Sequence, residues 1–407
     1  MRPDTVLVHA GRDPERFGGL VNAPVCRAST ILHPNMAAYR LAQSDKHARP
    51  YYGRFGTATH RMLEEACTQL DGGHGAVLFP SGLAACTGAL MSVAEPGTHL
   101  LMVDSVYGPV REFCDTVLAT HGVETEYYPP ALGSAIAARM RPNTCAVYCE
   151  SPGSLTFEVQ DLPAIAAAAH RAGASVLVDN TWATPLFCRP LTLGADITVQ
   201  AATKYLIGHS DAMLGVAVTN ERCYLPLRTA AARQGNSVSA DDCTLALRGM
   251  RTLGVRLRQH QASALALAHW LLHRSEVRRV DHPGLHTHPN HALWQRDFSG
   301  ASGLFGFELH PVPGHAVDAF IDGLELFGIG ASWGGFESLI LPSHPKRTSS
   351  DIAHPGGPLL RLHIGLEDIV DLQADIAGGL DRHIAPHLAA PGDAQFLPRE
   401  PLTGIPT

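Results

Sequence analysis

The sequence lacks any apolar run that approaches the roughly 20 residues of a membrane helix. Its N-terminus, MRPDTVLVHAGRDPERF, also lacks the cationic start and the long apolar segment of a signal peptide. These two absences predict that the protein has no membrane partner and a cytoplasmic location.

The chain has no excess of positive charge either. Its 31 lysine and arginine residues stand against 38 aspartate and glutamate residues, which gives a formal net charge of −7. A nucleic-acid surface needs a basic face, so no nucleic-acid partner is expected. Hydrophobic residues make up 45% of the 407 residues, which indicates a globular protein with a large core. The length predicts about two to three domains.

The nine cysteines lack the spacing of a structural site, because their number is odd, they are scattered and no CxxC pattern occurs. We therefore expect neither a disulfide framework nor a zinc site. Most of them are interpreted as small core residues. They are Cys26, Cys67, Cys86, Cys114, Cys145, Cys149, Cys188, Cys223 and Cys243.

Chemistry is concentrated in the stretch 175–211, which holds two short strand-like runs. Residues 175–178 are followed by Asp179, and residues 197–200 lead into Lys204. The carboxyl ends of parallel strands border the ligand crevice of open α/β sheets. An acid after one strand and a lysine after the next can therefore meet over one small molecule.

Pyridoxal phosphate (PLP) requires such a pair, because a lysine amine forms a Schiff base with it and a carboxylate keeps its pyridine nitrogen protonated. Taken alone, Asp179 could cap a helix and Lys204 could be a surface lysine. The apolar neighbours of Lys204 favour burial instead, and burial makes a lysine amine nucleophilic. These neighbours are Ala201, Ala202, Tyr205, Leu206 and Ile207.

Six collinear segments resemble the PLP-dependent enzymes of cysteine and methionine metabolism, the trans-sulfuration enzymes. Within that family they are most similar to the bacterial cystathionine β-lyases. The resemblance runs from about residue 6 to about residue 385. The segments are RPYYGRFGTATHRMLE (49–64), ESPGSLTFEVQDL (150–162), VDNTWATPLF (178–187), QAATKYLIGHSDAMLG (200–215), SWGGFESLI (332–340) and LLRLHIGLED (359–368).

The repeated strand–loop–helix order from 76 to 218 predicts an α/β fold with a mostly parallel sheet flanked by helices. The resemblance refines this prediction to fold type I of the PLP enzymes, the aspartate aminotransferase-like fold, with a smaller C-terminal α/β domain. Predicted strands are 76–79, 100–103 and 145–149, and predicted helices are 84–93, 163–171 and one that begins near His60 with Thr59 as its N-cap.

We expect four parts along the chain. Residues 1–56 form an arm that contacts a neighbouring subunit, and residues 57–247 form the PLP-binding domain. Residues 248–388 form the C-terminal domain, and residues 389–407 form a flexible tail. The helical pattern from Thr244 to His273 joins the two domains, and its arginines are interpreted as a solvated face.

Site residues follow mainly from the resemblance. Gly82 opens a helix, where a glycine lets backbone N–H groups approach a phosphate. The resemblance implies that Gly82, Leu83 and Thr203 bind the PLP phosphate, together with Tyr52 and Arg54 of the adjacent subunit. It implies that Tyr107 stacks on the ring and that the catalytic residues are Lys204, Tyr107 and Asp179. The implied substrate-binding residues are Arg361, Ser332, Trp333, Ser154 and Tyr52.

The expected reaction is α,β-elimination from an amino-acid thioether, which turns L-cystathionine into pyruvate, ammonia and homocysteine. Shared sites imply a homo-oligomer, a dimer that pairs into a tetramer. Three alternatives stay open: a γ-synthase or γ-lyase of the same family, a β-lyase for a specialised cysteine S-conjugate, and a regulatory protein of the same fold. Phe55 stands where bacterial β-lyases often carry a second cation, so the physiological substrate is open.

Four histidines crowd the stretch 282–291 at positions 282, 286, 288 and 291. Their spacing matches no zinc pattern, and the prolines and glycine among them predict an irregular loop. We interpret this stretch as an exposed loop that could bind metal adventitiously.

Overall fold

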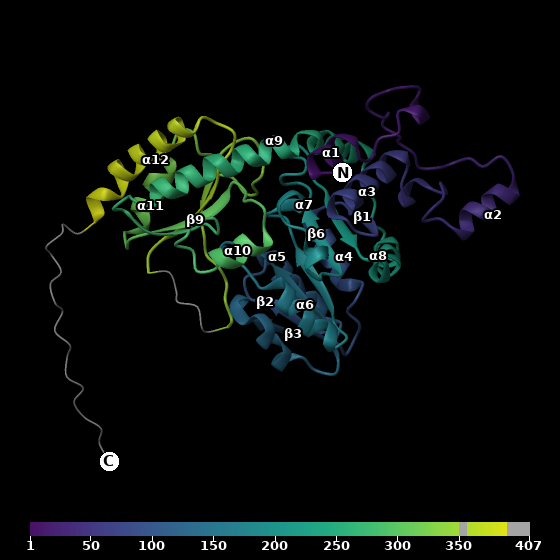
Figure 1. Ribbon diagram of the computed structural model, residues 1–407, viewed down its shortest axis with the longest axis horizontal. Coiled ribbons are helices and arrows are strands. Elements are labelled where there is room, and N and C mark those ends of the chain that lie inside the picture. Colours follow the sequence, from purple (N-terminus) through teal and green to yellow (C-terminus); the bar gives the residue numbers. More distant parts are fainter. Residues whose placement is uncertain (350–355, 389–407) are drawn as a thin grey trace, which may run out of the picture.

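The computed structural model describes residues 1–349 and 356–388, and it contains two sheets (Figure 1). The larger sheet has the strand order β1-β7-β6-β5-β4-β2-β3. Its strands are β1 (Gly75–Phe79), β2 (His99–Val103), β3 (Glu124–Tyr128), β4 (Thr144–Glu150), β5 (Ser175–Asp179), β6 (Ile197–Ala201) and β7 (Gly215–Thr219).

Only β7 runs against its neighbours in this seven-stranded sheet. It pairs antiparallel with both β1 and β6, whereas the pairs from β6 to β3 are all parallel. The predicted mostly parallel sheet is therefore confirmed. The sequences of these strands are short apolar runs. Helices cover both faces of a parallel sheet, so side chains on both faces of each strand are buried.

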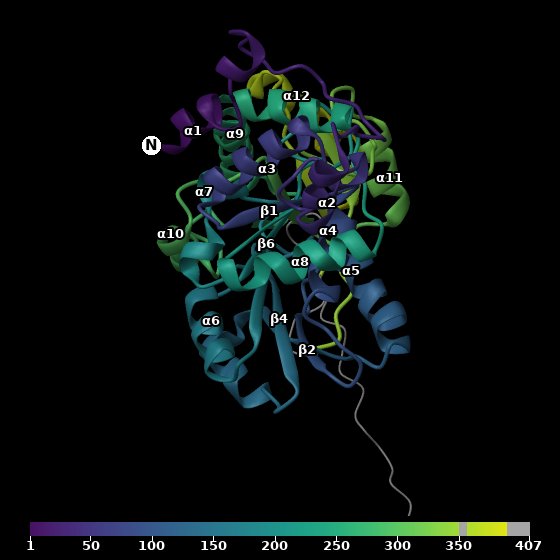
Figure 2. The same ribbon diagram turned by 90° about the vertical axis from the view of Figure 1, so that its right-hand side faces the viewer.

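Helices enclose the larger sheet from both sides (Figure 2). On β1, Val77 and Phe79 pack into one apolar cluster, whereas Ala76 and Leu78 pack into another, as the alternation of a strand requires. The helices of the described residues are α1 (Pro3–His9), α2 (Met36–Ser44), α3 (Ala58–Asp71), α4 (Gly82–Met91), α5 (Gly108–Phe113), α6 (Leu162–Arg171), α7 (Thr184–Phe187), α8 (Glu221–Arg233), α9 (Ala240–Leu271), α10 (His291–Asp297), α11 (Gly314–Asp322) and α12 (Ile369–His383).

The smaller sheet is antiparallel, with the order β10-β11-β9-β8. Its apolar face packs against α11, α12 and the end of α9 in a separate buried cluster. Arg361, one of the C-terminal site residues, lies in the middle of one strand of this sheet. The strands are β8 (Val277–Asp281), β9 (Leu304–Leu309), β10 (Leu339–Pro342) and β11 (Leu359–His363).

Helix α9 runs from the larger sheet to the smaller one, and the proposed boundary between residues 247 and 248 falls inside it (Figure 1). The interpretation of its arginines as a solvated face is wrong for two of them. Arg256 is buried and donates to the carbonyl of Gly249, and Arg251 donates to the carbonyls of Leu7 and Ala10. These side chains satisfy backbone carbonyls inside the fold.

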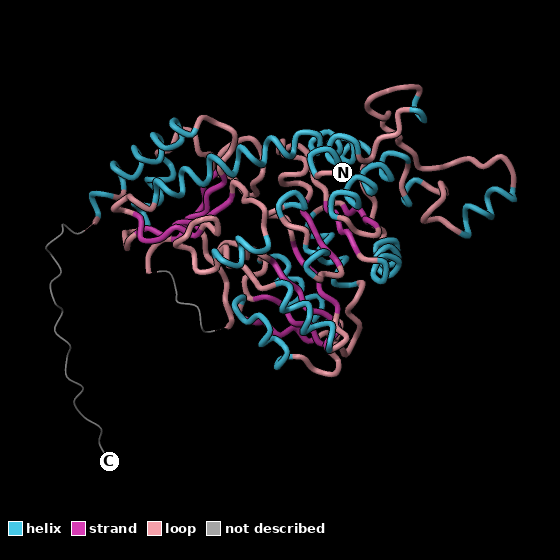
Figure 3. Tube along the Cα trace, in the orientation of Figure 1, coloured by secondary structure: helices cyan, strands magenta, loops and turns pink. Residues whose placement is uncertain are grey.

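The N-terminal arm has two parts. Its helix α1 packs against α9 and α3 through Val6 and Leu7. The rest is largely loop, and α2 projects away from the body of the chain (Figure 3). The arm ends in a single 3-10 turn, η2 (Gly53–Phe55), just before α3. The expected tail at 389–407 lies outside the described residues.

The predicted start of α3 was two residues late. Thr57 is the N-cap, with a reciprocal capping box in which His60 Nδ1 accepts from the Thr57 N–H at 3.0 Å. The Thr59 hydroxyl instead accepts from the N–H of Cys26, at 2.9 Å. The sequence allows either Thr57 or Thr59 to cap this helix. Thr57 is the cap because the hydroxyl of Thr59 is already bonded to Cys26.

The other predicted strands and helices are found within a few residues of their expected ends. Seven of the nine cysteines are buried, as expected for small core residues. Among the described residues, no helix is long and apolar enough to cross a membrane.

The interpretation of the histidine-rich stretch as an exposed loop is wrong for two of its residues. His282 is fully buried and His288 is 5% exposed. Burial lowers the pKa of His282 to about 3 and that of His288 to about 4. The ring of His282 packs beside Trp182 and Phe305. These two imidazoles serve as core side chains.

Candidate active site

The first element of the site is the carboxyl end of β5. Asp179 is the last residue of this strand and pairs with Val199 of β6. Its Oδ1 accepts from the N–H and the hydroxyl of Thr181, at 2.9 and 2.5 Å. The thiol of Cys86 approaches Oδ2 at 3.6 Å, so this oxygen has no strong donor among the described residues.

Burial raises the pKa of Asp179, while the bonds from Thr181, the bond from Cys86 and the nearby Lys204 amine lower it. A buried carboxylate of this kind is stabilised by a cation that approaches its second oxygen. A protonated ring nitrogen fits this requirement, since it brings both a positive charge and an N–H donor.

Lys204 follows β6 by three residues and lies half-buried. Its Nζ donates to the hydroxyl of Ser332 at 2.5 Å and lies 5.2 Å from the centre of the Trp333 ring. Burial and the Arg361 cation together lower the pKa of Lys204 to about 8, although Asp179 opposes the shift. The amine is therefore available in its neutral, nucleophilic form near neutral pH.

The turn 332–335 brings Ser332 to Lys204. Ser332 has φ of 82° and Gly334 has φ of 91°, so both lie in the left-handed region. A Cβ on Gly334 would lie 2.9 Å from the Cα of Lys204, so only glycine permits this approach. Nε2 of the buried His363 lies 3.2 Å from the Gly334 nitrogen and 3.1 Å from the Gly335 carbonyl.

Arg361 is the third residue of β11, two residues before His363, so the two side chains share one face of the strand. One of its Nη atoms donates to the carbonyl oxygen of Ser332 at 3.1 Å. Its other donors have no acceptor among the residues that the structure describes, so they could bind a bidentate anion. Burial lowers the pKa of Arg361. A carboxylate that binds this guanidinium would therefore be shielded from water, where a charge-assisted hydrogen bond is strong.

The N-terminus of α4 has the geometry expected of an anion site. Ser81 caps the helix by accepting from the N–H of Ala84 at 3.1 Å. The N–H groups of Gly82 and Leu83 have no acceptor among the described residues, as at any helix start. A Cβ on Gly82 would lie 2.4 Å from that of Ala201, so glycine is required for this turn to approach β6. A phosphate fits here.

Thr203 stands in the same region, but its hydroxyl is engaged. It donates to the carbonyl of Leu214 at 3.2 Å and accepts from the N–H of Leu214 at 2.9 Å. To donate to a phosphate, this hydroxyl would have to leave the Leu214 carbonyl.

Tyr107 lies between β2 and α5 with 45% of its surface exposed. Its backbone N–H donates to Glu150 at 2.7 Å. Burial raises the pKa of Tyr107, and Glu150 and Asp179 raise it while the Arg361 cation lowers it. The charges of Asp179 and Arg361 therefore both act on Tyr107. This is expected of a residue that stacks on a ligand held between Asp179 and Arg361.

Trp333 and Ser154 have different surroundings. Trp333 packs on Tyr205, with ring centres 5.4 Å apart, and so lies at the centre of the site. Ser154 donates its N–H to the carbonyl of Ser105 and lines a cavity that Val106 and Gly108 also border. No contact among the described residues joins Ser154 to Lys204.

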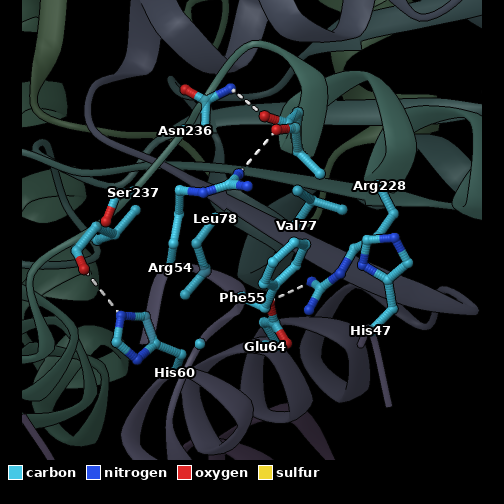
Figure 4. Close-up of a pocket in the computed structure, with 14 residues that line it drawn as sticks. His47, Arg54, Phe55, His60, Glu64, Val77, Leu78, Arg228, Asn236 and Ser237 are labelled. Atoms are coloured by element: carbon cyan, nitrogen blue, oxygen red, sulfur yellow. Dashed lines mark hydrogen bonds and ion pairs between the residues drawn. The ribbon is translucent and has the colours of Figure 1, made fainter. Parts of the chain in front are cut away.

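The arm residues are not brought to this centre within the chain. Arg54 donates to the carbonyl of Ala232 at 2.8 Å and lies 4.6 Å from the ring centre of Phe55 (Figure 4). It borders a cavity of about 50 Å³. In the described part of the chain, neither Tyr52 nor Arg54 contacts Lys204. A role for them at a PLP phosphate requires a second subunit.

Three residues were missed by sequence reasoning. Glu150 ends β4 as Asp179 ends β5, so the same rule could have found it. Thr181 stands two residues after an acid, which is the spacing of a local Asx-type turn. His363 alternates with Arg361 along β11, but nothing local indicates that it supports the turn before Lys204.

These residues suit one ligand group. Pyridoxal phosphate needs a helix start for its phosphate, a buried carboxylate for its ring nitrogen and a lysine with a lowered pKa. Its amino-acid substrate needs an arginine for the carboxylate. The site contains residues suited to each of these roles. The fold and the site thus define a PLP-dependent enzyme of fold type I. The model of the Cys/Met metabolism PLP-dependent enzymes matches residues 4–381, and the chain belongs to this family.

Several relatives are similar over nearly their whole length. The cystathionine beta-lyase MetC of Escherichia coli is 44% identical over 388 residues, which cover 93% of this chain and 98% of the relative. The cystathionine beta-lyase of Haemophilus influenzae is 40% identical, with the same coverage. The L-methionine gamma-lyase of Pseudomonas putida is 34% identical, over 92% of this chain and 96% of its own.

Proposed function

We propose that this protein is a carbon–sulfur β-lyase that cleaves L-cystathionine, or a related cysteine S-conjugate, by α,β-elimination. The overall reaction consumes one water and releases pyruvate, ammonia and a thiol, which is homocysteine when the substrate is cystathionine. The observation that carries the proposal is the convergence of Lys204, Ser332 and Arg361, since it sets a basic amine beside a carboxylate-binding pair.

The chain's own residues divide the work in this proposal. Arg361 and Ser332 bind the α-carboxylate of the substrate and so fix which Cα bond faces the reacting centre. Gly82 and Leu83 donate backbone N–H groups to the phosphate, and Asp179 holds a proton on the ring nitrogen. Bound pyridoxal phosphate supplies the electron sink for the charge that develops at Cα.

Lys204 moves the protons of the reaction. Its amine takes the proton from Cα as a general base, and the resulting ammonium donates to the leaving sulfur when the Cβ–S bond breaks. The lowered pKa of Lys204 suits both steps, because a group that titrates near the working pH can accept and return a proton.

The proposal includes a shared active site. Tyr52 and Arg54 would reach the phosphate of the neighbouring subunit, with at least a dimer as the active form. Support comes from the arm, which projects from the body of the chain and exposes apolar side chains such as Leu32 and Met36. Two such dimers would form the expected tetramer.

Product analysis tests the function. The holoenzyme is incubated with L-cystathionine, and the keto acid and the thiol are identified by mass spectrometry. Pyruvate with homocysteine is expected. 2-Oxobutyrate with cysteine would contradict the proposal and point to γ-cleavage, which the similarity to an L-methionine gamma-lyase makes the relevant alternative. If the holoenzyme turned over no amino-acid thioether, the proposal would be contradicted, and the alternative of a regulatory protein with the same fold would be favoured.

A further inference from the structure

Three neighbouring strands of the larger sheet end beside Tyr107. The strand order β5-β4-β2 places β4 between the strand that ends in Asp179 and the strand that leads to Tyr107. Glu150 is the last residue of β4 and pairs in register with Asp179. Paired residues of neighbouring parallel strands point to the same face of a sheet, and such strands lie about 5 Å apart. The two carboxyl groups therefore lie side by side.

Glu150 has no positively charged partner in the part of the chain that the structure describes. Its titratable neighbours are one acid and three groups that are uncharged at neutral pH, because burial raises the pKa of each of the three. They are Asp179 on β5, Tyr107 before α5, Tyr148 two residues earlier on β4, and Cys86 on α4. Two adjacent carboxylates without a cation between them repel each other, so the pair is expected to hold one proton.

The surroundings of the two carboxyl groups decide which of them carries the proton. Asp179 accepts from the N–H and the hydroxyl of Thr181, and the nearby Lys204 amine also favours its charge. Among the described residues, the Glu150 carboxyl accepts only from the backbone N–H of Tyr107, at 2.7 Å. Burial first, and then Asp179, raise the pKa of Glu150 well above its usual range, although the bond from Tyr107 lowers it. The charge therefore belongs to Asp179.

We propose that Glu150 is a positioning residue that carries this proton and holds Tyr107 at the ring of PLP. A neutral carboxyl group still accepts the Tyr107 N–H through its carbonyl oxygen, so the contact needs no second charge. Asp179 is then the single carboxylate that faces the ring nitrogen. The inference goes beyond the proposed function, because it holds for β-cleavage and γ-cleavage alike.

Infrared spectroscopy of the apoprotein tests the position of the proton. The carbonyl stretch of a protonated carboxyl group is separate from the bands of carboxylates and amides. Subtracting the spectrum of Glu150→Gln from that of the wild type therefore isolates this residue. At neutral pH we expect a protonated-carboxyl band that the variant lacks, and carboxylate bands in its place would overturn the inference.

Glu221→Gln is the matched control for this measurement. Glu221 is exposed in the first turn of α8, and an exposed glutamate is ionised at neutral pH. Subtracting the spectrum of this variant from that of the wild type should show carboxylate bands alone. The same protonated-carboxyl band in both difference spectra would assign it to another residue and overturn the inference.

Two substitutions test the positioning of Tyr107. Glu150→Gln keeps a neutral carbonyl acceptor and should lower kcat/KM for L-cystathionine by about threefold at most. Glu150→Met keeps the length of the side chain but leaves the Tyr107 N–H without this acceptor, so kcat/KM should fall about tenfold or more. The PLP content, measured by absorbance, should stay at one per chain in both variants. Equal losses in the two variants, or a loss of PLP, would overturn the inference.

A double-mutant cycle shows whether Glu150 acts through Tyr107. If it does, Glu150→Met should cost little in a Tyr107→Ala background, because the ring that Glu150 positions is already absent. The two losses should therefore fail to add. Additive losses would mean that Glu150 acts through another group, and they would overturn the positioning role.

The infrared result does not depend on the proposed function, because it is measured without substrate. A protein that turned over no thioether would contradict the β-lyase proposal, and the same bands would still decide the protonation of Glu150. If the product analysis finds γ-cleavage, the kinetic comparisons use the 2-oxobutyrate that is released. Their expected losses stay the same, since Tyr107 faces the cofactor ring in either reaction.

Discussion

The amine of Lys204 lies 2.5 Å from the hydroxyl of Ser332, although 128 positions separate the two residues in the chain. Lys204 follows a strand of the larger sheet, and Ser332 stands in the turn that leads to the smaller one. The contact therefore joins the two sheets at the reacting centre. The proposed base and the proposed carboxylate-binding residues form one site only when both sheets are in place.

Cofactor capture should report the lowered pKa of Lys204. An amine reacts in its neutral form, so the rate at which the apoprotein captures PLP should rise with pH up to about 8 and then level off. An ordinary lysine, with a pKa of about 10.4, would give a rate that still rises at pH 9. Stopped-flow absorbance across pH 6–10 measures the profile.

Two variants separate the causes of that shift. Arg361→Met removes a cation that lowers the pKa of Lys204, so the inflection should move to higher pH. Ser332→Ala removes the hydroxyl neighbour without changing a charge, and its inflection should stay near that of the wild type. An inflection near pH 10 in the wild-type profile would show that the amine is not perturbed.

Arg361→Lys should weaken substrate binding more than it disturbs the cofactor. Lysine keeps the positive charge but cannot present two parallel N–H donors to a carboxylate. We expect kcat/KM to fall by about thirtyfold or more, in line with the loss of a buried charged contact. The PLP content, measured by absorbance, should stay at one per chain, and a loss of PLP would assign Arg361 to the cofactor instead.

Gly82→Ala should reduce cofactor affinity. The new Cβ would lie 2.4 Å from the Cβ of Ala201, so the start of α4 must shift. Its backbone N–H groups would then no longer point at the phosphate. A loss of about tenfold to a hundredfold in PLP affinity matches one or two weakened bonds to a charged group.

Gly314→Ala is the matched control for Gly82→Ala. Gly314 is also the first residue of a helix, α11, and its Cβ would meet nothing within 4 Å. Equilibrium dialysis with PLP should find the wild-type affinity for this variant. Equal affinities for both variants would mean that the α4 start does not hold the phosphate.

Local sequence was sufficient for the parts of the site that follow strands of the larger sheet. The runs before Asp179 and Lys204 are short, apolar and rich in β-branched residues, and a parallel sheet sets their ends side by side. Gly82 could also be singled out from local sequence, because a glycine at a helix start lets backbone N–H groups approach a phosphate.

Long-range contacts account for what the sequence did not reveal. The sequence around Asp104 predicts an acidic residue in a loop and nothing more. In the structure, its carboxylate accepts hydrogen bonds from Thr348 and Ser349, more than 240 positions away. His282 stands among prolines and glycines that predict a loop, yet aromatic rings bury it. Neither pattern contains information about which distant segment packs on it.

His282 should make the protein sensitive to acid. Its folded pKa of about 3 lies below the value of about 6.5 in the unfolded chain, so only the unfolded state binds its proton between these values. The stabilisation is present above pH 6.5 and is lost as the pH falls toward 3. Between pH 7 and 5 one such group removes about 2 kcal/mol of unfolding free energy.

The variant His282→Phe isolates this contribution. Phenylalanine retains the ring packing on Trp182 and Phe305 but takes up no proton, so urea unfolding should lose about 2 kcal/mol less between pH 7 and 5 than in the wild type. His121→Gln changes an exposed histidine and should keep the wild-type slope. Identical slopes for all three proteins would show that His282 does not control the acid response.

Subunit complementation tests whether the arm completes a neighbouring site. Arg54→Ala and Lys204→Ala should each be inactive, but mixed subunits should regain activity. Random pairing makes half of the dimers hybrids, and each hybrid has one site with both residues intact, so about a quarter of the wild-type activity is expected. Lys204→Ala mixed with Asp179→Asn is the control, because these two residues belong to the same chain's part of the site and no pairing restores both. No recovery with Arg54→Ala would mean that each chain builds its site alone, and recovery in the control would mean that Lys204 and Asp179 of one site come from different chains.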